Sequence, residues 1–371
     1  MKRASLLLIP VLLLAGLIGW LLLRQHHARL DAALLRAVSH HDAPHVASLL
    51  AQGADPNTRD WKTYTPGGRL PFRPPWYEQP LAALRRRRPR LAYPYVGPTV
   101  LMIAADHGDT AIAQDLLGHG ADVTKTGSMV EDDYHEGDTP VHPVAPLWEA
   151  VKEDHADTAA LLLKHGAPVD GRGWGLTPLH LTGDLKITTA LLDAGADVNA
   201  GSDEPESGTV GETQLHRAVR GSVPVVDGAP NLPLASLLLR RGAKIEAKDY
   251  YGKTPLMGAS EKGSVEGVKL LLRWGAHVNA QDNSGRTALM IAAEQRHTEA
   301  LRLLLAHGAS VNAQDDLGQD ALMLASDLGY ADLDTEWQGQ RQARLRLLRQ
   351  HGANASLKDK QGKTAAAYVI P

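Results

Sequence analysis

The stretch from Gly242 to Ala313 decides the fold, because it repeats itself at a fixed interval. Three segments in it are alike: Gly242-Ala243-Lys244-Ile245-Glu246-Ala247, Gly275-Ala276-His277-Val278-Asn279-Ala280 and Gly308-Ala309-Ser310-Val311-Asn312-Ala313. Their first glycines are 33 residues apart, twice. A second marker stands 21 residues before each of the later two glycines, as Thr254-Pro255-Leu256-Met257 and Thr287-Ala288-Leu289-Met290. A fixed period of this length predicts stacked supersecondary units.

Each marker residue has a physical role in a pair of helices. The threonine can cap the first helix with its hydroxyl oxygen, and Pro255 suits the first helical position, where its missing N–H has no cost. The glycine suits a left-handed residue just past the end of the second helix. The second helix carries a triple-leucine run, in which we expect these residues to be buried: Leu270, Leu271, Leu303 and Leu304. One such unit cannot bury its own apolar face, so the units must stack.

These residues resemble the ankyrin repeat, whose signature is Thr-Pro-Leu-His followed by two helices and Gly-Ala-Asp-Val-Asn. The resemblance covers nearly everything after Leu30 and implies an all-α solenoid of helix pairs with hairpin fingers. It also implies protein binding, with no partner common to the family. It is weakest in repeat eight, where Asp320 replaces the threonine. Eight Gly-Ala markers predict eight repeats: Gly53, Gly120, Gly166, Gly195, Gly242, Gly275, Gly308 and Gly352.

Irregular spacing between these markers locates insertions in the repeat domain, residues 31–371. Two insertions are long, at 58–96 and 124–144, and smaller ones lie near 201–211, 221–232 and 329–342. An insertion before the Thr-Pro marker lengthens a finger, and insertions often mark the working face. The step from Gly166 to Gly195 is short instead, so repeat four must lose about one turn of its first helix or of the following turn.

Composition narrows the classes of function. The 371 residues have a net charge of −3 and contain no cysteine. The near-neutral charge argues against nucleic-acid binding, and the lack of cysteine excludes disulfides, thiolate catalysis and cysteine-bound zinc. The sequence has no phosphate-loop, Gly-x-Ser-x-Gly or His-Glu-x-x-His motif. We therefore predict no enzyme activity, no cofactor and no metal site.

The N-terminus reads as a membrane anchor. A short basic tail, residues 1–3, precedes twenty uncharged residues at 4–23 and a linker at 24–30. Twenty helical residues span about 30 Å, the thickness of the hydrocarbon layer. The alternative is a cleaved signal peptide, but Trp20 to Arg24 offers no small-x-small cleavage site. We expect a transmembrane signal anchor.

The side of the membrane on which the repeats lie depends on the charges that flank the apolar segment. Basic residues flank the apolar segment almost equally, so the positive-inside rule gives no preference. The very short N-terminal tail is similar to that of bacterial signal anchors. We expect a single-pass protein of the inner (cytoplasmic) membrane of a bacterium, with the repeats on the periplasmic side. The cytoplasmic side is the alternative.

The first long insertion is the candidate binding site. Residues 61–95 hold seven of the seventeen aromatic residues of the chain and eight basic residues against one acid. Aromatic and arginine side chains are favoured at the centres of interfaces. The predicted partner-binding residues are Trp61, Trp76, Tyr77, Arg85, Arg86, Arg87 and Arg88. Alternatives are packing against repeats one and two, contact with anionic lipid, and pairing with the acidic second insertion.

Histidine is abundant, with seventeen residues. His119, His165, His307 and His351 each precede a marker glycine, which indicates a scaffold role at a helix C-terminus. His40, His41 and His45 lie at the turn and second helix of repeat one, where His41 replaces a turn glycine. We interpret them as an exposed turn, with a metal-ligand pair as the alternative.

The favoured function is a membrane-tethered scaffold that binds another protein with its concave face and fingers. One alternative is an inhibitor or immunity-type protein that neutralises an effector. A second is a hydrolase with an unrecognised site in the insertions. If the first insertion is not the site, the concave face of repeats five to seven is the next candidate.

Overall fold

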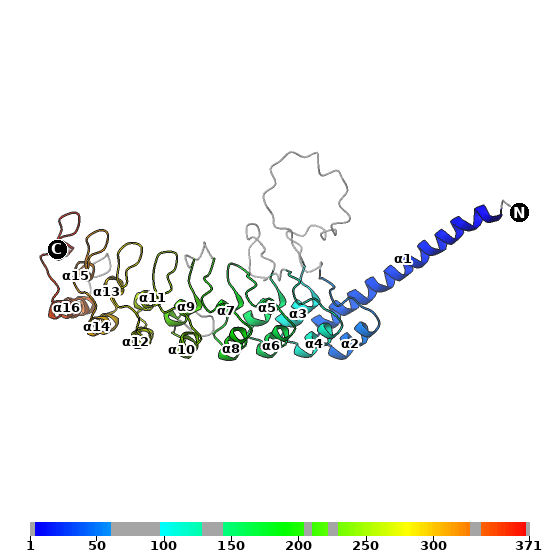
Figure 1. Ribbon diagram of the computed structural model, residues 1–371, viewed down its shortest axis with the longest axis horizontal. Coiled ribbons are helices and arrows are strands. Elements are labelled where there is room, and N and C mark those ends of the chain that lie inside the picture. The colour runs from blue at the N-terminus through cyan, green and yellow to red at the C-terminus, as the bar shows by residue number, and fades with distance from the viewer. Residues whose placement is uncertain are drawn as a thin grey trace, which may run out of the picture. The chain divides into compact units, whose positions relative to one another are not determined.

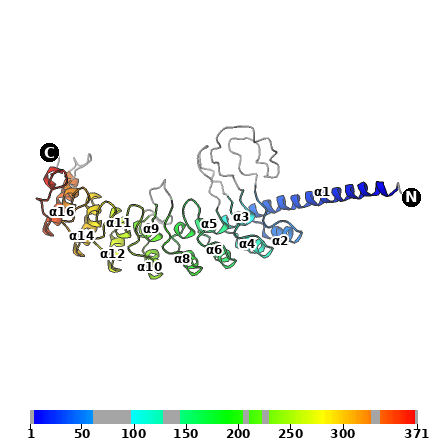
Figure 2. The same cartoon turned by 45° about the horizontal axis from the view of Figure 1, so that its top comes forward.

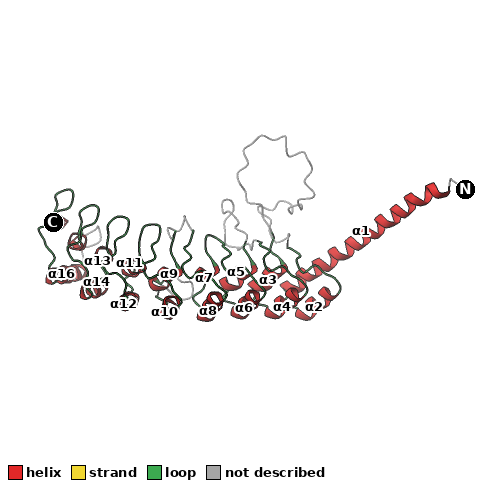
Figure 3. Ribbon diagram, in the orientation of Figure 1, coloured by secondary structure: helices red, strands yellow, loops and turns green. Residues whose placement is uncertain are grey.

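The computed structural model describes residues 4–60, 97–127, 144–203, 210–221, 229–326 and 335–368, and of 4–16 and 335–338 only the backbone. Over these ranges every regular element is a helix, and pairing between extended segments is limited to isolated bridges such as Gln281 with Thr287 (Figure 3). The predicted all-α fold is therefore confirmed for this part of the chain. The helices fall into two compact units, Met1–Gly173 and Trp174–Pro371.

The first unit holds the long N-terminal helix and five short ones (Figure 1). Their bounds are α1 (Ala4–Ser39), α2 (Ala43–Ala51), α3 (Val100–Asp106), α4 (Thr110–Gly118), α5 (Pro146–Lys152) and α6 (Ala156–Lys164). The last part of α1 is the first helix of repeat one, because Leu34 and Val38 are fully buried and α1 packs on α2 and α3. Residues 24–30, predicted as a linker, continue this helix without a break.

The predicted membrane span at residues 4–23 is not confirmed. No helix in the described residues has both the length and the apolar stretch that crossing a membrane requires.

The second unit holds the remaining elements. They are α7 (Pro178–Leu181), α8 (Leu185–Asp193), α9 (Gln214–Arg220), α10 (Leu232–Arg240), α11 (Pro255–Glu261), α12 (Val265–Arg273), α13 (Ala288–Glu294), α14 (Thr298–Ala306), α15 (Ala321–Ser326), α16 (Thr335–Gln350) and a 3-10 turn, η4 (Ala365–Tyr368). Figures 1 and 2 show α10, α12 and α14 along one side of this unit, with loops extending beyond the first helices on the other. Helix α7 has four residues where α9, α11 and α13 have seven, which confirms the predicted shortening in repeat four.

The core of the second unit lies between the two layers of helices. Helix α13 packs against α11, α14 and α15, so all residues from Ala288 to Ala293 are buried. In the second helices, Leu271 and Leu304 are fully buried, as predicted. Leu270 and Leu303 are only partly buried, contrary to the prediction. Consecutive residues of a helix point about 100° apart, so a run of three leucines cannot place all its members in a narrow core face.

The asparagine of the marker segment fastens one repeat to the next. The Asn279 side-chain amide donates to the Gly308 carbonyl at 3.1 Å, and its oxygen accepts from the Ser310 amide at 2.7 Å. Asn57, Asn199 and Asn312 make the same two bonds to the following marker. Asparagine suits this position because its side chain can donate one hydrogen bond and accept another, and here it makes both to the next repeat.

The turn between the two helices of a repeat carries a second link. His155 Nε2 donates to the Asp106 carbonyl at 2.8 Å, and its ring lies over Gly108, where an added Cβ would be 2.5 Å from Nδ1. His297 repeats the arrangement over Gly263, with a bond of 3.0 Å to the Glu261 carbonyl. A histidine at the start of the second helix of one repeat therefore requires a glycine in the corresponding turn of the preceding repeat.

Candidate partner-binding surface

The binding residues predicted in the first insertion, Trp61 to Arg88, lie outside the described residues, as does most of the acidic second insertion. What the structure describes is the base of both. Arg59 Nη1 donates to the carbonyls of Gly97 and Thr126, each at 2.8 Å. One guanidinium thus joins the roots of the two insertions, and its burial lowers the pKa of Arg59.

The fingers of the second unit share one construction. Asp249 Oδ1 accepts from the amides of Tyr251 and Lys253, at 2.9 and 2.8 Å, and so closes the fingertip turn. Asp282, Asp315 and Asp359 close the next three turns in the same way. Backbone bonds then join neighbouring fingers, among them Asn283 N–H to Tyr251 O at 3.0 Å. A row of tips linked in this way holds exposed side chains in fixed positions.

Two tyrosines stand on one of these tips. Tyr250 and Tyr251 are 68% and 49% exposed, and their rings meet edge to face with centroids 5.3 Å apart. They line a cavity of about 530 Å³ together with Lys253, Asp282, Asn283, Ser284 and Arg286. Exposed aromatic rings beside basic side chains favour protein binding, because such residues bury much area at low entropic cost.

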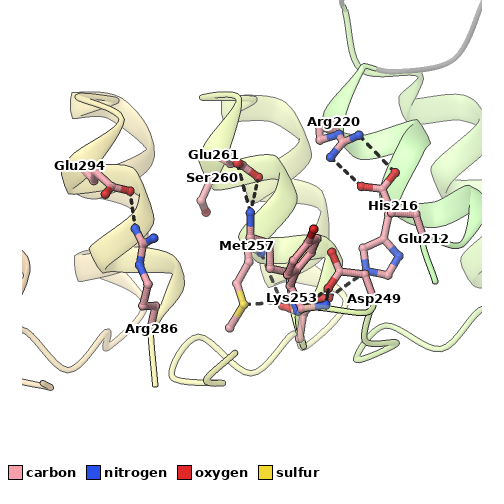
Figure 4. A network of polar contacts seen from close by, with 12 residues as sticks. Glu212, His216, Arg220, Asp249, Lys253, Met257, Ser260, Glu261, Arg286 and Glu294 are labelled. Carbon is pink, nitrogen blue, oxygen red and sulfur yellow. Dashed lines mark hydrogen bonds and ion pairs between the residues drawn. The ribbon is translucent and has the colours of Figure 1, made fainter. Parts of the chain in front are cut away.

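Ion pairs form a row between the bases of these fingers and the first helices that follow them (Figure 4). In repeats five, six and seven the residue before the capping threonine pairs with the last residue of the first helix. Lys253 Nζ lies 3.1 Å from both carboxylate oxygens of Glu261, and Arg286 pairs with Glu294. Both pairs are partly exposed, so each contributes about 1 kcal/mol or less to stability. Their charges remain accessible to a partner.

The pair nearest the start of the row is more buried. Glu212 accepts two bonds from Arg220, at 2.6 and 3.1 Å, and its side chain is only 4% exposed. Burial raises the pKa of Glu212, while the charges of Arg220 and Arg217 oppose the rise. This pair is therefore part of the structural frame of the surface, whereas the pairs of Lys253 and Arg286 are more exposed.

Histidine holds the early repeats of this unit in register. His216 Nδ1 accepts from the Thr213 amide at 3.2 Å, so its Nε2–H donates to the Lys253 carbonyl at 3.1 Å. Burial lowers the pKa of His216 from 6.5 to about 4, which keeps the ring neutral at pH 7. His180 makes equivalent bonds to Thr177 and to the Glu212 carbonyl. The fourth residue of the Thr-Pro-Leu-His motif thus positions the finger of the next repeat.

The predicted binding site lies in the first insertion, and the second candidate was the concave face of repeats five to seven, not the fingertip that carries Tyr250 and Tyr251. The signal for the tyrosines was present, since Tyr250 and Tyr251 occupy the two exposed positions of an Asp-x-x-Gly turn. The scaffold role of the histidines before the marker glycines is confirmed for three of them. His119, His307 and His351 each donate from Nδ1 to the carbonyl four residues earlier, at 2.8–2.9 Å.

Comparison with known proteins agrees with this architecture. The chain is 32% identical over 120 residues to a protein of Danio rerio named as a palmitoyltransferase, ZDHHC13, a match that covers 31% of this chain and 16% of that protein. It is 36% identical over 114 residues to an ankyrin repeat protein of Rickettsia felis, which covers 28% of this chain and 45% of that protein. Each match therefore spans less than half of the relative.

A family model gives the broader match. The model described as ankyrin repeats in three copies matches residues 101–202, 183–282 and 275–333, together more than half of the chain. Ankyrin repeats indicate a role in protein–protein interaction. With the helix pairs, the marker asparagines and the linked fingers described above, this match shows that the chain belongs to the ankyrin repeat family.

Proposed function

We propose that the chain is a membrane-tethered adaptor that binds a partner protein on the finger face of repeats five to seven. The observation that carries the proposal is the exposed pair Tyr250 and Tyr251 beside Lys253 and Arg286. The rings supply apolar area that a partner can cover, and the two cations supply orientation and faster association. A partner segment with an apolar residue next to an acidic one fits this chemistry.

Photo-crosslinking on the full chain tests the surface. A crosslinking amino acid at position 251 is expected to capture one discrete partner in the source organism. The same amino acid at position 274 serves as the control, because Trp274 is also exposed, at 45%, but does not line the cavity. Equal capture from both positions, or crosslinks only to other copies of the chain, would contradict the proposal.

Affinity measured with the captured protein gives the second step. Tyr250→Ala with Tyr251→Ala is expected to weaken its binding at least tenfold, the size of effect seen when central aromatic residues are truncated. Trp274→Ala is expected to leave the affinity unchanged. Both variants alter exposed side chains, so circular dichroism and unfolding temperature are expected to match those of the unmodified protein.

The first insertion remains a proposed second contact. Its aromatic and arginine content supports protein binding through Trp76, whereas anionic lipid would depend on the run from Arg85 to Arg88. The two readings separate when Trp76→Ala and neutralisation of the four arginines are compared. Loss of partner capture with Trp76→Ala favours protein, and loss of liposome flotation with the arginine variant favours lipid.

The tether is proposed for residues 4–23. Its support is the uncharged sequence, together with the apolar side chains at the end of that segment. Ile18, Trp20, Leu22 and Leu23 are each at least 50% exposed. A helix that is apolar around its circumference needs an apolar environment.

The proposed location is the inner membrane of a bacterium with the repeats in the periplasm, so alkaline phosphatase fused after Pro371 is expected to be active. If a cytoplasmic reporter fused at the same position is active instead, the repeats lie on the cytoplasmic side.

A further inference from the structure

We propose that His41, His107 and Asp109 form a binding site for a late first-row divalent ion such as Zn²⁺, which fastens repeat one to repeat two. The three side chains come from positions up to 68 residues apart in sequence, yet each offers a ligand atom within 4.8 Å of the other two. His41 Nδ1 lies 2.7 Å and His107 Nδ1 3.9 Å from the same oxygen, Asp109 Oδ2. The site is separate from the proposed partner-binding surface.

The spacing suits the coordination sphere of zinc. Two ligand atoms bound to one zinc ion at tetrahedral angles are about 3.3 Å apart, since each metal–ligand bond is about 2.0–2.1 Å. The two separations from Asp109 Oδ2, 2.7 and 3.9 Å, lie on either side of this value. The third pair, His41 with His107, also offers ligand atoms within 4.8 Å of each other. Rotation of these partly exposed side chains can bring the three atoms to coordinating distance.

The backbone holds all three ligands at defined places. His41 occupies the left-handed turn position of repeat one, with a φ of 57°. His107 and Asp109 flank Gly108 in the corresponding turn of repeat two, between α3 and α4. The two turns thus present their side chains to each other, and the imidazole rings lie with centroids 4.6 Å apart.

Asp109 behaves differently from the other aspartate, asparagine and serine residues at its position. It is the N-cap of α4, yet its side chain makes no capping bond, whereas Asp42, Asp184, Asn231 and Ser264 cap their helices. Its carboxylate turns instead to His41 in the neighbouring repeat. The geometry therefore favours contact between the repeats over the local cap.

The set of donors selects the ion. Two imidazoles and one carboxylate suit zinc, nickel or copper, whereas magnesium and calcium prefer oxygen ligands alone. The side chains of His41, His107 and Asp109 are 55%, 29% and 22% exposed, so an ion can reach them and retain bound water. Asp106 Oδ2 lies 3.9 Å from His107 Nε2, where a carboxylate would orient the ring behind a metal held by Nδ1.

Titration of the full chain with Zn²⁺ tests the site. One equivalent is expected to bind, to raise the unfolding temperature, and to resist competition by Mg²⁺. His41→Gly removes a ligand while keeping the left-handed turn, because glycine adopts positive φ without strain. It is expected to weaken zinc binding at least tenfold, as is His107→Ala.

His45→Ala is the matched control, because His45 is an exposed histidine one helical turn from His41 that lies outside the cluster. It is expected to bind zinc as the unmodified chain does. The site is refuted if the unmodified chain takes up no zinc equivalent, or if His41→Gly binds as tightly as the unmodified chain. A loss in His45→Ala equal to that in His41→Gly refutes it as well.

Discussion

Two pairs of repeats in the second unit differ in how they join their neighbours. In repeats four and five the fourth motif residue is His180 or His216, which bonds its own threonine and also the backbone of the next finger. In repeats six and seven it is Met257 or Met290, whose sulfur accepts from the threonine amide at 3.4 Å. A thioether has no proton to donate, so Met257 and Met290 keep the bond to their own threonine but cannot bond the backbone of the next finger. The later repeats are therefore joined by apolar packing, the marker asparagines, the fingertip bonds and the bond from His297 to the Glu261 carbonyl.

The largest expected effects on stability come from the buried leucines of the hydrophobic core, which extends through repeats from both pairs. Leu238→Ala in repeat five and Leu304→Ala in repeat seven each remove a fully buried side chain. Each is expected to lower the free energy of unfolding by about 2–5 kcal/mol, since both leave a cavity. Chemical denaturation measures the loss. Leu303→Ala is the control and should cost clearly less, because Leu303 is only partly buried; an equal loss would disprove this assignment of the core face.

Charge pairs give the next comparison. Arg220→Ala leaves the buried Glu212 carboxylate without its main partner, at an expected cost of about 2–3 kcal/mol. Lys253→Ala removes the matching pair in repeat six but leaves Glu261 in contact with water, and is expected to cost about 1 kcal/mol or less. Urea titrations of both variants measure the difference. Equal costs would mean that burial does not separate the two pairs.

The histidine link predicts a dependence on pH that the methionine junctions lack. The pKa of His216 is about 4 when folded and 6.5 when unfolded, so between these values the unfolded chain takes up a proton that the folded chain does not. Its contribution to stability is complete above pH 6.5 and declines as the pH falls towards 4. From pH 7 to pH 5 the loss is about 2 kcal/mol. His216→Met should lose about that much less stability over the same interval, as judged by denaturation at both pH values.

The smallest expected effect comes from giving repeat six the histidine link that its fourth motif residue, Met257, does not make. In Met257→His the new Nε2–H is positioned to reach the carbonyl of Arg286, the counterpart of Lys253 in the next repeat. One additional buried hydrogen bond contributes about 0.5–1.5 kcal/mol. Thermal unfolding at pH 7 measures the gain, with Met257→Leu as the control that adds no donor. A variant no more stable than this control would show that the later repeats are spaced differently.

The periodic residues made the helix pairs, the capping threonines and the shortened α7 predictable, because each depends on neighbours close in sequence. The long-range features were harder to predict. The pairing of Lys253 with Glu261 needs the register of a whole helix, and the meeting of His41 with Asp109 is hidden by a long insertion between their repeats. Leu270 was misplaced because composition does not state which way a side chain points.

The histidine over a turn glycine restricts how repeats of this chain can be exchanged. His155 fits only behind Gly108, and His297 only behind Gly263. His41, Asp154 and Arg296 place a side chain at the same left-handed position. A repeat that begins its second helix with histidine therefore cannot follow a repeat that has a side chain at this left-handed position. Recombination among these modules, in evolution or in design, must carry the glycine and the histidine across the junction together.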